Sequence, residues 1–291
     1  MAHARQSAKR AATRSTGRGP NPDMNAGHDL LGVVTAAIDP EAIAALLASE
    51  GFVAADEEAR ELIARAAGDA SLLDALVRRR LTGEPLAWIT GATLFCGREI
   101  RVDPGVYVPR PQSEALALRA VARLPADGAA IDVCTGSGAI ATTLMARRPG
   151  ARVVACDVDE RAVACATANG VEAHRGDLFE PLPRALQRRA DVVVGVVPYV
   201  PTPELALLQR DTFAFESRLS YDGGPDGAGV LRRVVAGAPR FLRPGGALLL
   251  ELGGDEADAL RADLERAGYG DVAVLVDEDG DVRGIEATLH R

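Results

Sequence analysis

The sequence predicts an α/β protein with a Rossmann-like, doubly wound sheet, preceded by a small helical domain and a β-hairpin linker. Three observations predict this fold. Apolar runs alternate with helix-like stretches over the second half of the chain, which is typical of parallel strands joined by helices. A glycine-rich turn follows the first of these runs, where doubly wound sheets bind ligands. The first half instead spaces its apolar residues by three and four, as amphipathic helices do.

Residues 1–27 are predicted to be a disordered basic tail, because they offer almost nothing to bury. The basic residues of this segment are Arg5, Lys9, Arg10, Arg14 and Arg18. Such a tail could contact nucleic acid or the ribosome, but basic tails are commonly just solvated, and the solvated reading is favoured. Met24 is an alternative start of the chain.

Residues 28–82 are predicted to form the small helical domain, with three or four short helices. Asp39 precedes Pro40, and this pair is typical of a capped helix start with proline at the first helical position. Gly51 and Gly68 are expected to end helices.

Residues 83–110 are predicted to be the β-hairpin linker. Their β-branched, aromatic and other apolar residues are interrupted by Gly91, Gly97 and Gly105, which favours short strands joined by turns. Trp88 is expected to pack within this linker rather than to stack on a substrate.

Residues 111–291 are predicted to form the sheet domain. The clearest strands are Ala130–Cys134, Ala151–Asp157, Asp191–Val197 and Ala247–Glu251. The helices expected between and after them are Ala139–Arg147, Glu160–Asn169, Gly227–Phe241 and Asp255–Ala267. A closing hairpin is predicted from the runs Val272–Val276 and Ile285–Leu289, which flank a turn at 277–280.

Composition narrows the class of function. The formal net charge of −8 gives no overall field that attracts nucleic acid, so no direct DNA binding is expected. No stretch approaches the roughly 18 consecutive apolar residues of a membrane span, and a cytoplasmic enzyme without membrane association is the natural expectation. Four cysteines lack the paired short spacings of a zinc site. They are expected to be reduced and buried, with no metal bound, and are Cys96, Cys134, Cys156 and Cys165.

The turn after the first predicted strand is a candidate ligand site. It contains Asp132, Thr135, Gly136 and Gly138, and glycines there let the backbone approach a ligand closely. A lone Gly-x-Gly also fits phosphate or dinucleotide binding, although the Lys-Ser/Thr pair of a phosphate loop is absent. Asp157 ends the second strand about 20 residues further on, where a carboxylate can bind ribose hydroxyls.

A third carboxylate, Asp177, follows the third strand and precedes Leu178. Each of these three carboxylates, taken singly, could simply cap a helix or end a strand. Together, at the ends of three consecutive strands, they favour a cofactor site. His174 lies on the third strand and is expected to be structural.

Several motifs follow one another along the chain from about Arg78 onward. They are Gly83–Gly91, Val108–Glu114, the glycine-rich turn, Asp157, Gly176–Phe179 and Val197–Val200. In this order and at these spacings the chain resembles the HemK/PrmC family of protein-(glutamine-N5) methyltransferases. The block Pro109-Arg110-Pro111-Gln112-Ser113-Glu114 matches the pattern Pro-Arg-Pro-x-Ser/Thr-Glu, which is specific to that family among methyltransferases.

The resemblance implies a class I methyltransferase sheet that binds S-adenosylmethionine and methylates a glutamine of a protein, which is a peptide chain release factor in translation termination or a related protein substrate. Residues that it implies for the cofactor are Asp132, Thr135, Gly136, Gly138, Asp157, Asp177 and Leu178. In such enzymes a carboxylate at the position of Asp177 holds the adenine amino group, and an apolar side chain covers the ring. Arg110 is expected to pair with Glu114 across one helical turn or to frame the cofactor, and Glu216 to support a loop.

The catalytic signature of the family is Asn-Pro-Pro-Tyr, and the aligned residues are Val196, Val197, Pro198 and Tyr199. In the family the asparagine oxygen and the carbonyl of the first proline accept the two hydrogens of the substrate amide, which orients its nitrogen for methyl transfer. Val196 cannot accept a hydrogen bond. This departure resembles a divergent, actinobacterial-type paralogue. Methylation of another amino group or of a small molecule, and a catalytically weak protein that binds S-adenosylmethionine, stay open as alternatives.

Overall fold

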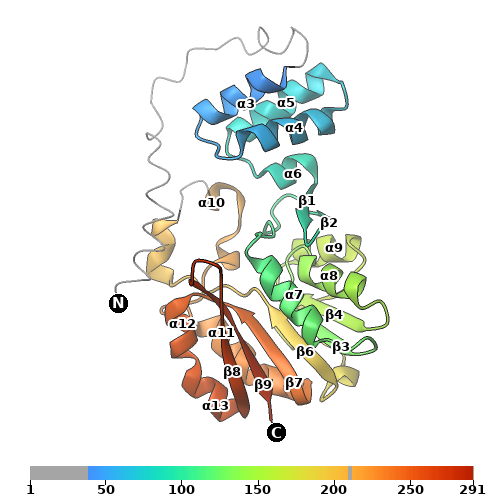
Figure 1. Ribbon diagram of the computed structural model, residues 1–291, viewed down its shortest axis with the longest axis vertical. Helices are drawn as coiled ribbons and strands as arrows, with labels where there is room; N and C mark the ends of the chain where they lie inside the picture. The colour runs from blue at the N-terminus through green and yellow to red at the C-terminus, as the bar shows by residue number, and fades with distance from the viewer. Residues whose placement is uncertain (1–38, 209–211, 291) are drawn as a thin grey trace. The chain divides into compact units, whose positions relative to one another are not determined.

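The computed structural model describes residues 39–208 and 212–290 (Figure 1). The chain divides after Gly91 into two compact units, and each is described by itself. The predicted basic tail, residues 1–27, and the first residues of the predicted helical domain lie outside the described residues.

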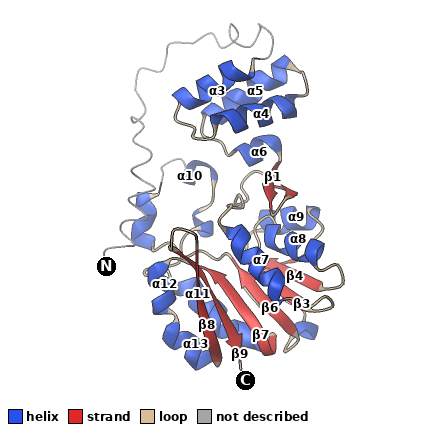
Figure 2. Cartoon of the chain, in the orientation of Figure 1, coloured by secondary structure: helices blue, strands red, loops and turns tan. Residues whose placement is uncertain are grey.

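The first unit is helical within the described residues (Figure 2). Its helices are α3 (Pro40–Ser49), α4 (Ala55–Ala66), α5 (Ala70–Leu81) and α6 (Leu86–Thr90). The predicted helix start is confirmed, because the Asp39 side chain accepts a hydrogen bond from the Glu41 N–H and Pro40 stands in the first turn. Gly51 and Gly68 both have positive φ, as expected of residues that end helices. The core contains Ile43, Leu47, Leu62, Leu73, Leu76 and Ile89.

The predicted hairpin over 83–110 is wrong in its first part. Trp88 and its neighbours form the short helix α6, which begins after Pro85 and ends at Gly91 with φ +86. Periodicity cannot separate a buried helical turn from a short strand, and this explains the error. The hairpin itself is present but short, and pairs β1 (Ala92–Phe95) with β2 (Arg98–Arg101).

The second unit is built on one seven-stranded sheet with the order β5-β4-β3-β6-β7-β9-β8. Its strands are β3 (Ala129–Val133), β4 (Arg152–Asp157), β5 (Glu172–Arg175), β6 (Ala190–Gly195), β7 (Leu242–Glu251), β8 (Tyr269–Val276) and β9 (Val282–Leu289). The first five are parallel, whereas β9 runs antiparallel to both of its neighbours. The predicted doubly wound sheet and its closing hairpin are confirmed.

Helices cover both faces of this sheet. Residues of α7 (Ser113–Arg123), α8 (Ala139–Arg147) and α9 (Glu160–Ala168) belong to one core cluster. Residues of α11 (Gly229–Gly237), α12 (Gly254–Ala259) and α13 (Arg261–Ala267) belong to or pack against the other. Alternate residues of a strand enter opposite clusters, as Val193 and Val194 of β6 do, which buries the parallel strands on both faces.

The remaining elements are short. They are α10 (Thr212–Phe215) and the 3₁₀ turns η1 (Arg184–Leu186), η2 (Thr202–Leu207), η3 (Arg218–Ser220) and η4 (Ala238–Arg240). Two predicted helices are interrupted: the one expected at 227–241 passes into η4 at Pro239, and the one expected at 255–267 divides at Leu260. Proline disfavours a continuing helix because it lacks an N–H.

The cysteines carry no disulfide, and Cys134 is half-buried while the other three are buried. In the part of the chain that the structure describes, no three His, Cys, Asp or Glu residues lie together as metal ligands would. Over the same ranges, no helix has the length and apolar character needed to cross a membrane.

Candidate active site

A cavity of about 600 Å³ lies in the second unit, against the residues that follow β3, β4 and β6. Because the carboxyl ends of parallel strands meet at one edge of a sheet, residues far apart in the sequence converge there. All of the predicted cofactor and catalytic residues line this cavity except Gly138. The structure therefore brings the two predicted groups together.

The glycine-rich turn connects β3 to α8 and forms one wall of the cavity. A side-chain Cβ built at Gly136 would meet no atom within 4 Å, so the backbone is open to a ligand at this point. At Gly138 a Cβ would approach Ala166 and Val171 at 3.1 Å. Gly138, with φ +81, thus permits close helix packing behind the wall and does not itself face the cavity.

Asp132 braces the turn from inside the sheet. Its side chain is buried, and one carboxylate oxygen accepts hydrogen bonds from the Thr135 hydroxyl at 2.6 Å and from the Ala141 N–H at 3.2 Å. Burial raises the pKa of Asp132 to about 7, against the lowering effect of these two donors. Both donors belong to the turn and to the first turn of α8, so Asp132 sets the shape of this wall.

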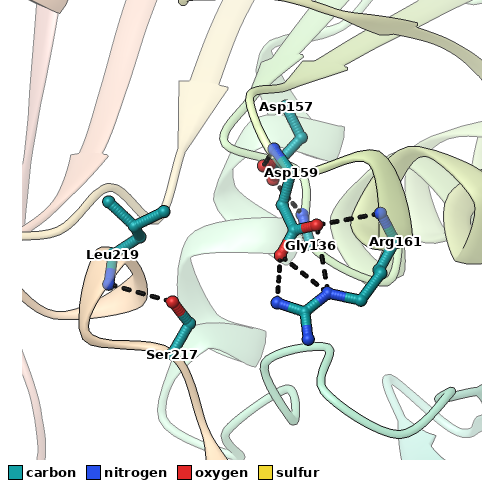
Figure 3. Close-up of polar contacts among 6 residues, drawn as sticks. All are labelled: Gly136, Asp157, Asp159, Arg161, Ser217 and Leu219. Atoms are coloured by element: carbon teal, nitrogen blue, oxygen red, sulfur yellow. Dashed lines mark hydrogen bonds and ion pairs between the residues drawn. The ribbon is translucent and has the colours of Figure 1, made fainter.

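Asp157 joins two backbone segments at the end of β4 (Figure 3). Its carboxylate accepts hydrogen bonds from the Gly136 N–H and the Asp159 N–H, each at 2.9 Å. Burial raises the pKa of Asp157. Asp159 in turn caps α9 and pairs with Arg161 at 2.7 Å, which lowers the pKa of Asp159. The Asp157 carboxylate is thereby fixed while it lines the cavity.

Ser137 is a site residue that sequence reasoning missed. It lies between the two glycines of the turn, is 2% exposed and lines the cavity. Its hydroxyl has no hydrogen-bond partner among the described residues. A buried hydroxyl left unpaired is unfavourable, and this one lies within the turn itself. The only sequence signal was a hydroxyl residue between two glycines.

Asp177 and Leu178 follow β5 at the same edge. Asp177 is half-exposed and its carboxylate pairs with the Arg233 guanidinium, so it is shared between this partner and any ligand. Leu178 has φ +49, a left-handed conformation that is rare for a branched side chain. Such backbone strain is concentrated at functional sites, and here it places Leu178 in the cavity wall.

The segment Val196 to Tyr199 follows β6. In the sheet, β6 lies beside β3 on the side away from β4. Val196 is half-buried and packs against the core that α7 and α8 cover, whereas Val197 is buried in the other core. The Tyr199 hydroxyl donates a hydrogen bond to Glu251 at 3.4 Å. Burial, together with the Glu251 charge, raises the pKa of Tyr199.

Arg110 does not pair with Glu114, so that part of the prediction is wrong. It pairs with the buried carboxylate of Glu216 at 2.7 Å, and its guanidinium lies 4.9 Å from the centre of the Tyr107 ring. Glu114 instead accepts a hydrogen bond from the Cys96 N–H at 2.9 Å. The reason is that Arg110 precedes α7, which begins at Ser113, so the two residues do not share a helical turn.

Glu216 also accepts a hydrogen bond from the Val108 N–H at 3.0 Å. The expected supporting role of Glu216 is therefore confirmed, and the loop it supports is the Pro-Arg-Pro segment. Tyr107 and Tyr221 complete this part of the wall, with an edge-to-face contact at 5.7 Å between ring centres. His174 is on β5 as predicted, contacts Glu172 and does not line the cavity.

Comparisons with known proteins show which family the chain resembles. Residues 99–191 match the model of the methyltransferase small domain family. Over 211 residues the chain is 37% identical to the release factor glutamine methyltransferase of Geobacter sulfurreducens, covering 70% of this chain and 73% of that protein. The corresponding protein of Neisseria gonorrhoeae is 38% identical over 214 residues, covering 71% and 77%.

Among solved structures, a methyltransferase from Pyrococcus furiosus superposes with a TM-score of 0.50 and 19% identity, covering 67% of this chain and 91% of that one. At this identity the likeness concerns the fold alone, which it supports as a methyltransferase fold.

Proposed function

The chain belongs to the release factor glutamine methyltransferase family, and on that premise we propose that it methylates the side-chain amide nitrogen of a glutamine in a peptide chain release factor. The observation that carries the proposal is a single cavity that combines the glycine-rich turn with the segment Val197-Pro198-Tyr199. The methyl donor of this family is S-adenosylmethionine, which supplies a methyl group on a positively charged sulfur.

The residues of the cavity fit this donor. Gly136 leaves open space beside the backbone, and Asp157 offers a carboxylate that the protein already holds in place. A fixed carboxylate suits the two hydroxyls of a ribose, because it can accept both without reorganising. Leu178 supplies an apolar surface, and the buried Asp132 holds the glycine-rich turn in shape through its hydrogen bonds to Thr135 and Ala141.

The other wall must orient a poor nucleophile. The lone pair of an amide nitrogen is delocalised into the carbonyl, so the rate depends on holding that nitrogen in line with the methyl group. Val196 has no side-chain acceptor for an amide hydrogen, and the backbone carbonyl of Val197 is the acceptor that the segment retains. Pro198 limits the freedom of this backbone, and Tyr199 adds an aromatic surface to the wall.

Two backbone hydrogen bonds also fix the end of this segment. The Val200 N–H donates to the Tyr221 carbonyl at 2.9 Å, and the Val200 carbonyl accepts from the Gly223 N–H at 2.9 Å. These bonds tie the end of the signature segment to the loop that carries Tyr221. An anchor three residues after Val197 limits the movement of the segment that carries the proposed acceptor carbonyl, and a preorganised acceptor can orient an amide.

The test is transfer of label from S-adenosylmethionine to a purified release factor. Mass spectrometry should find N5-methylglutamine in the release factor, and a release factor whose acceptor glutamine is changed to alanine is the matched control. Label in another amino group or in the small-molecule fraction would support the first alternative and contradict the proposal. Tight cofactor binding with no label in any protein would support the binding-only alternative, which the loss of an acceptor at Val196 favours.

A further inference from the structure

Glu251 is a buried carboxylate that the proposed reaction does not yet use. It ends β7, is 4% exposed and does not line the cavity. Its two oxygens nevertheless contact two residues that do line it: the Ser113 hydroxyl donates to Oε2 at 2.6 Å, and the Tyr199 hydroxyl donates to Oε1 at 3.4 Å. Glu251 therefore lies directly behind the wall and joins two of its segments.

Ion pairing does not explain this burial. Among the described residues no cation forms a salt bridge with Glu251, although Arg283 on β9 lies near enough to lower its pKa. Tyr107, on the loop before α7, is the further titratable group that feels the Glu251 charge. Burial dominates and raises the pKa of Glu251. A buried carboxylate is unfavourable unless specific contacts compensate, and the contacts present are the two hydroxyls.

Glu286 provides the contrast within the same sheet. It is 5% exposed, pairs across from Leu249 of β7, and forms salt bridges to Arg119 and Arg123 of α7. Its burial is explained by ion pairs that attach a helix to the sheet. Glu251 has the same burial without such a partner, and both of its hydrogen bonds lead to the cavity wall.

Resting on the proposed function, we propose that Glu251 is a positioning residue for methyl transfer, which fixes the Tyr199 ring and the start of α7 through its two hydroxyl contacts. A tyrosine whose hydroxyl is anchored retains one ring orientation, and Tyr199 lies two residues after Val197, whose backbone carbonyl is the proposed acceptor for the substrate amide. Because the proposed cofactor residues follow β3, β4 and β5 and none of them contacts Glu251, Glu251 should affect the transfer step and not cofactor affinity.

A double-mutant cycle with Glu251→Gln and Tyr199→Phe tests this proposal. Each variant should lower the single-turnover rate at saturating S-adenosylmethionine by about 10-fold, the effect of losing one hydrogen bond. Since both changes act on the same hydrogen bond, Glu251→Gln by removing its charge and Tyr199→Phe by removing its donor, the double variant should be no slower than the slower single variant. The dissociation constant of S-adenosylmethionine, measured by calorimetry, should stay within about twofold of the wild-type value, because the roughly 10-fold effect is expected on the transfer step alone.

Glu286→Gln is the matched control and should lower stability while leaving the transfer rate unchanged. Ser113→Ala removes only the other hydroxyl, and should slow transfer even if Glu251→Gln folds poorly. The same cycle measured by denaturant unfolding reports the Tyr199 to Glu251 contact without any turnover.

Multiplying effects in the double variant, or a wild-type rate in Glu251→Gln, would overturn the proposal while the proposed function stands. A wild type that labels no glutamine would overturn both, and unfolding coupling between the two residues would then show that the contact exists but serves no methyl transfer.

Discussion

Replacing Asp157 by alanine should weaken S-adenosylmethionine binding and also loosen the site, and the two effects can be separated. The carboxylate accepts two backbone N–H groups, from Gly136 and Asp159, at 2.9 Å each. A ligand's hydroxyls would add hydrogen bonds to the same charged group, which are worth about 1.5–3 kcal/mol, or roughly 10- to 150-fold in dissociation constant. The same substitution leaves the two N–H groups without their acceptor. This should lower the free energy of unfolding by about 1–3 kcal/mol, the value for an unsatisfied donor.

Calorimetry with S-adenosylmethionine measures the first effect, and denaturant unfolding without ligand measures the second. Asp191→Asn is the matched control, because Asp191 accepts the Ala129 N–H at 2.8 Å and pairs with Arg243, but does not line the cavity. It should lower stability and leave the dissociation constant unchanged. Burial raises the pKa of Asp157, so wild-type affinity should also fall on acidification, as the carboxylate takes up a proton.

If Asp157→Ala lowers the free energy of unfolding as expected but binds S-adenosylmethionine with wild-type affinity, the carboxylate is only a brace between two turns. The ribose role would then have to be withdrawn.

Three further outcomes are expected. Burial raises the pKa of Asp132 from 3.8 to about 7, so the folded state holds this proton more tightly than the unfolded state, and the resulting stabilisation is present below pH 3.8 and is lost as the pH rises through about 7. The free energy of unfolding of Asp132→Asn, measured relative to wild type, should therefore rise by up to about 4 kcal/mol over that range. A difference that stays constant with pH would contradict this. Glu216→Gln leaves the half-buried Arg110 without its partner and should lower the free energy of unfolding by about 2 kcal/mol in denaturant, whereas no change would show that the pair contributes nothing. Val196→Asn should raise the single-turnover methylation rate by less than the roughly 100- to 1,000-fold that one preorganised group contributes, and a slower variant would mean that Val196 is adapted to another nucleophile.

The sheet domain could be predicted from sequence because its signals are local. Parallel strands buried on both faces appear as continuous apolar runs, and β3, β4 and β6 were located to within one or two residues. Residues at the ends of such strands meet at one edge whatever the loops do. The positions of Asp132, Asp157 and Tyr199 around one cavity follow from this rule.

The contacts behind the cavity wall could not be predicted, since they join residues far apart in the sequence. Arg110 was assigned the partner four residues away, but the structure pairs it with Glu216, 106 residues along the chain. Ser113 and Glu251 are separated by 138 residues. A hydrophobic period says nothing about which polar side chain faces which, because that depends on how loops after different strands cross.

The two walls of the cavity, the glycine-rich turn with Asp157 and the segment Val196 to Tyr199, should therefore differ in their tolerance of amino-acid substitutions elsewhere in the chain. The cofactor wall is held by backbone hydrogen bonds to carboxylates at strand ends, which are properties of the fold. The substrate wall depends on side-chain contacts between segments, through Arg110 to Glu216 and through Ser113 and Tyr199 to Glu251. On the proposed assignment, a substrate amide that finds no asparagine at position 196 depends more on the Val197 carbonyl. Variants in the contacts behind the wall should then reduce turnover more in this chain than in a relative with asparagine at that position.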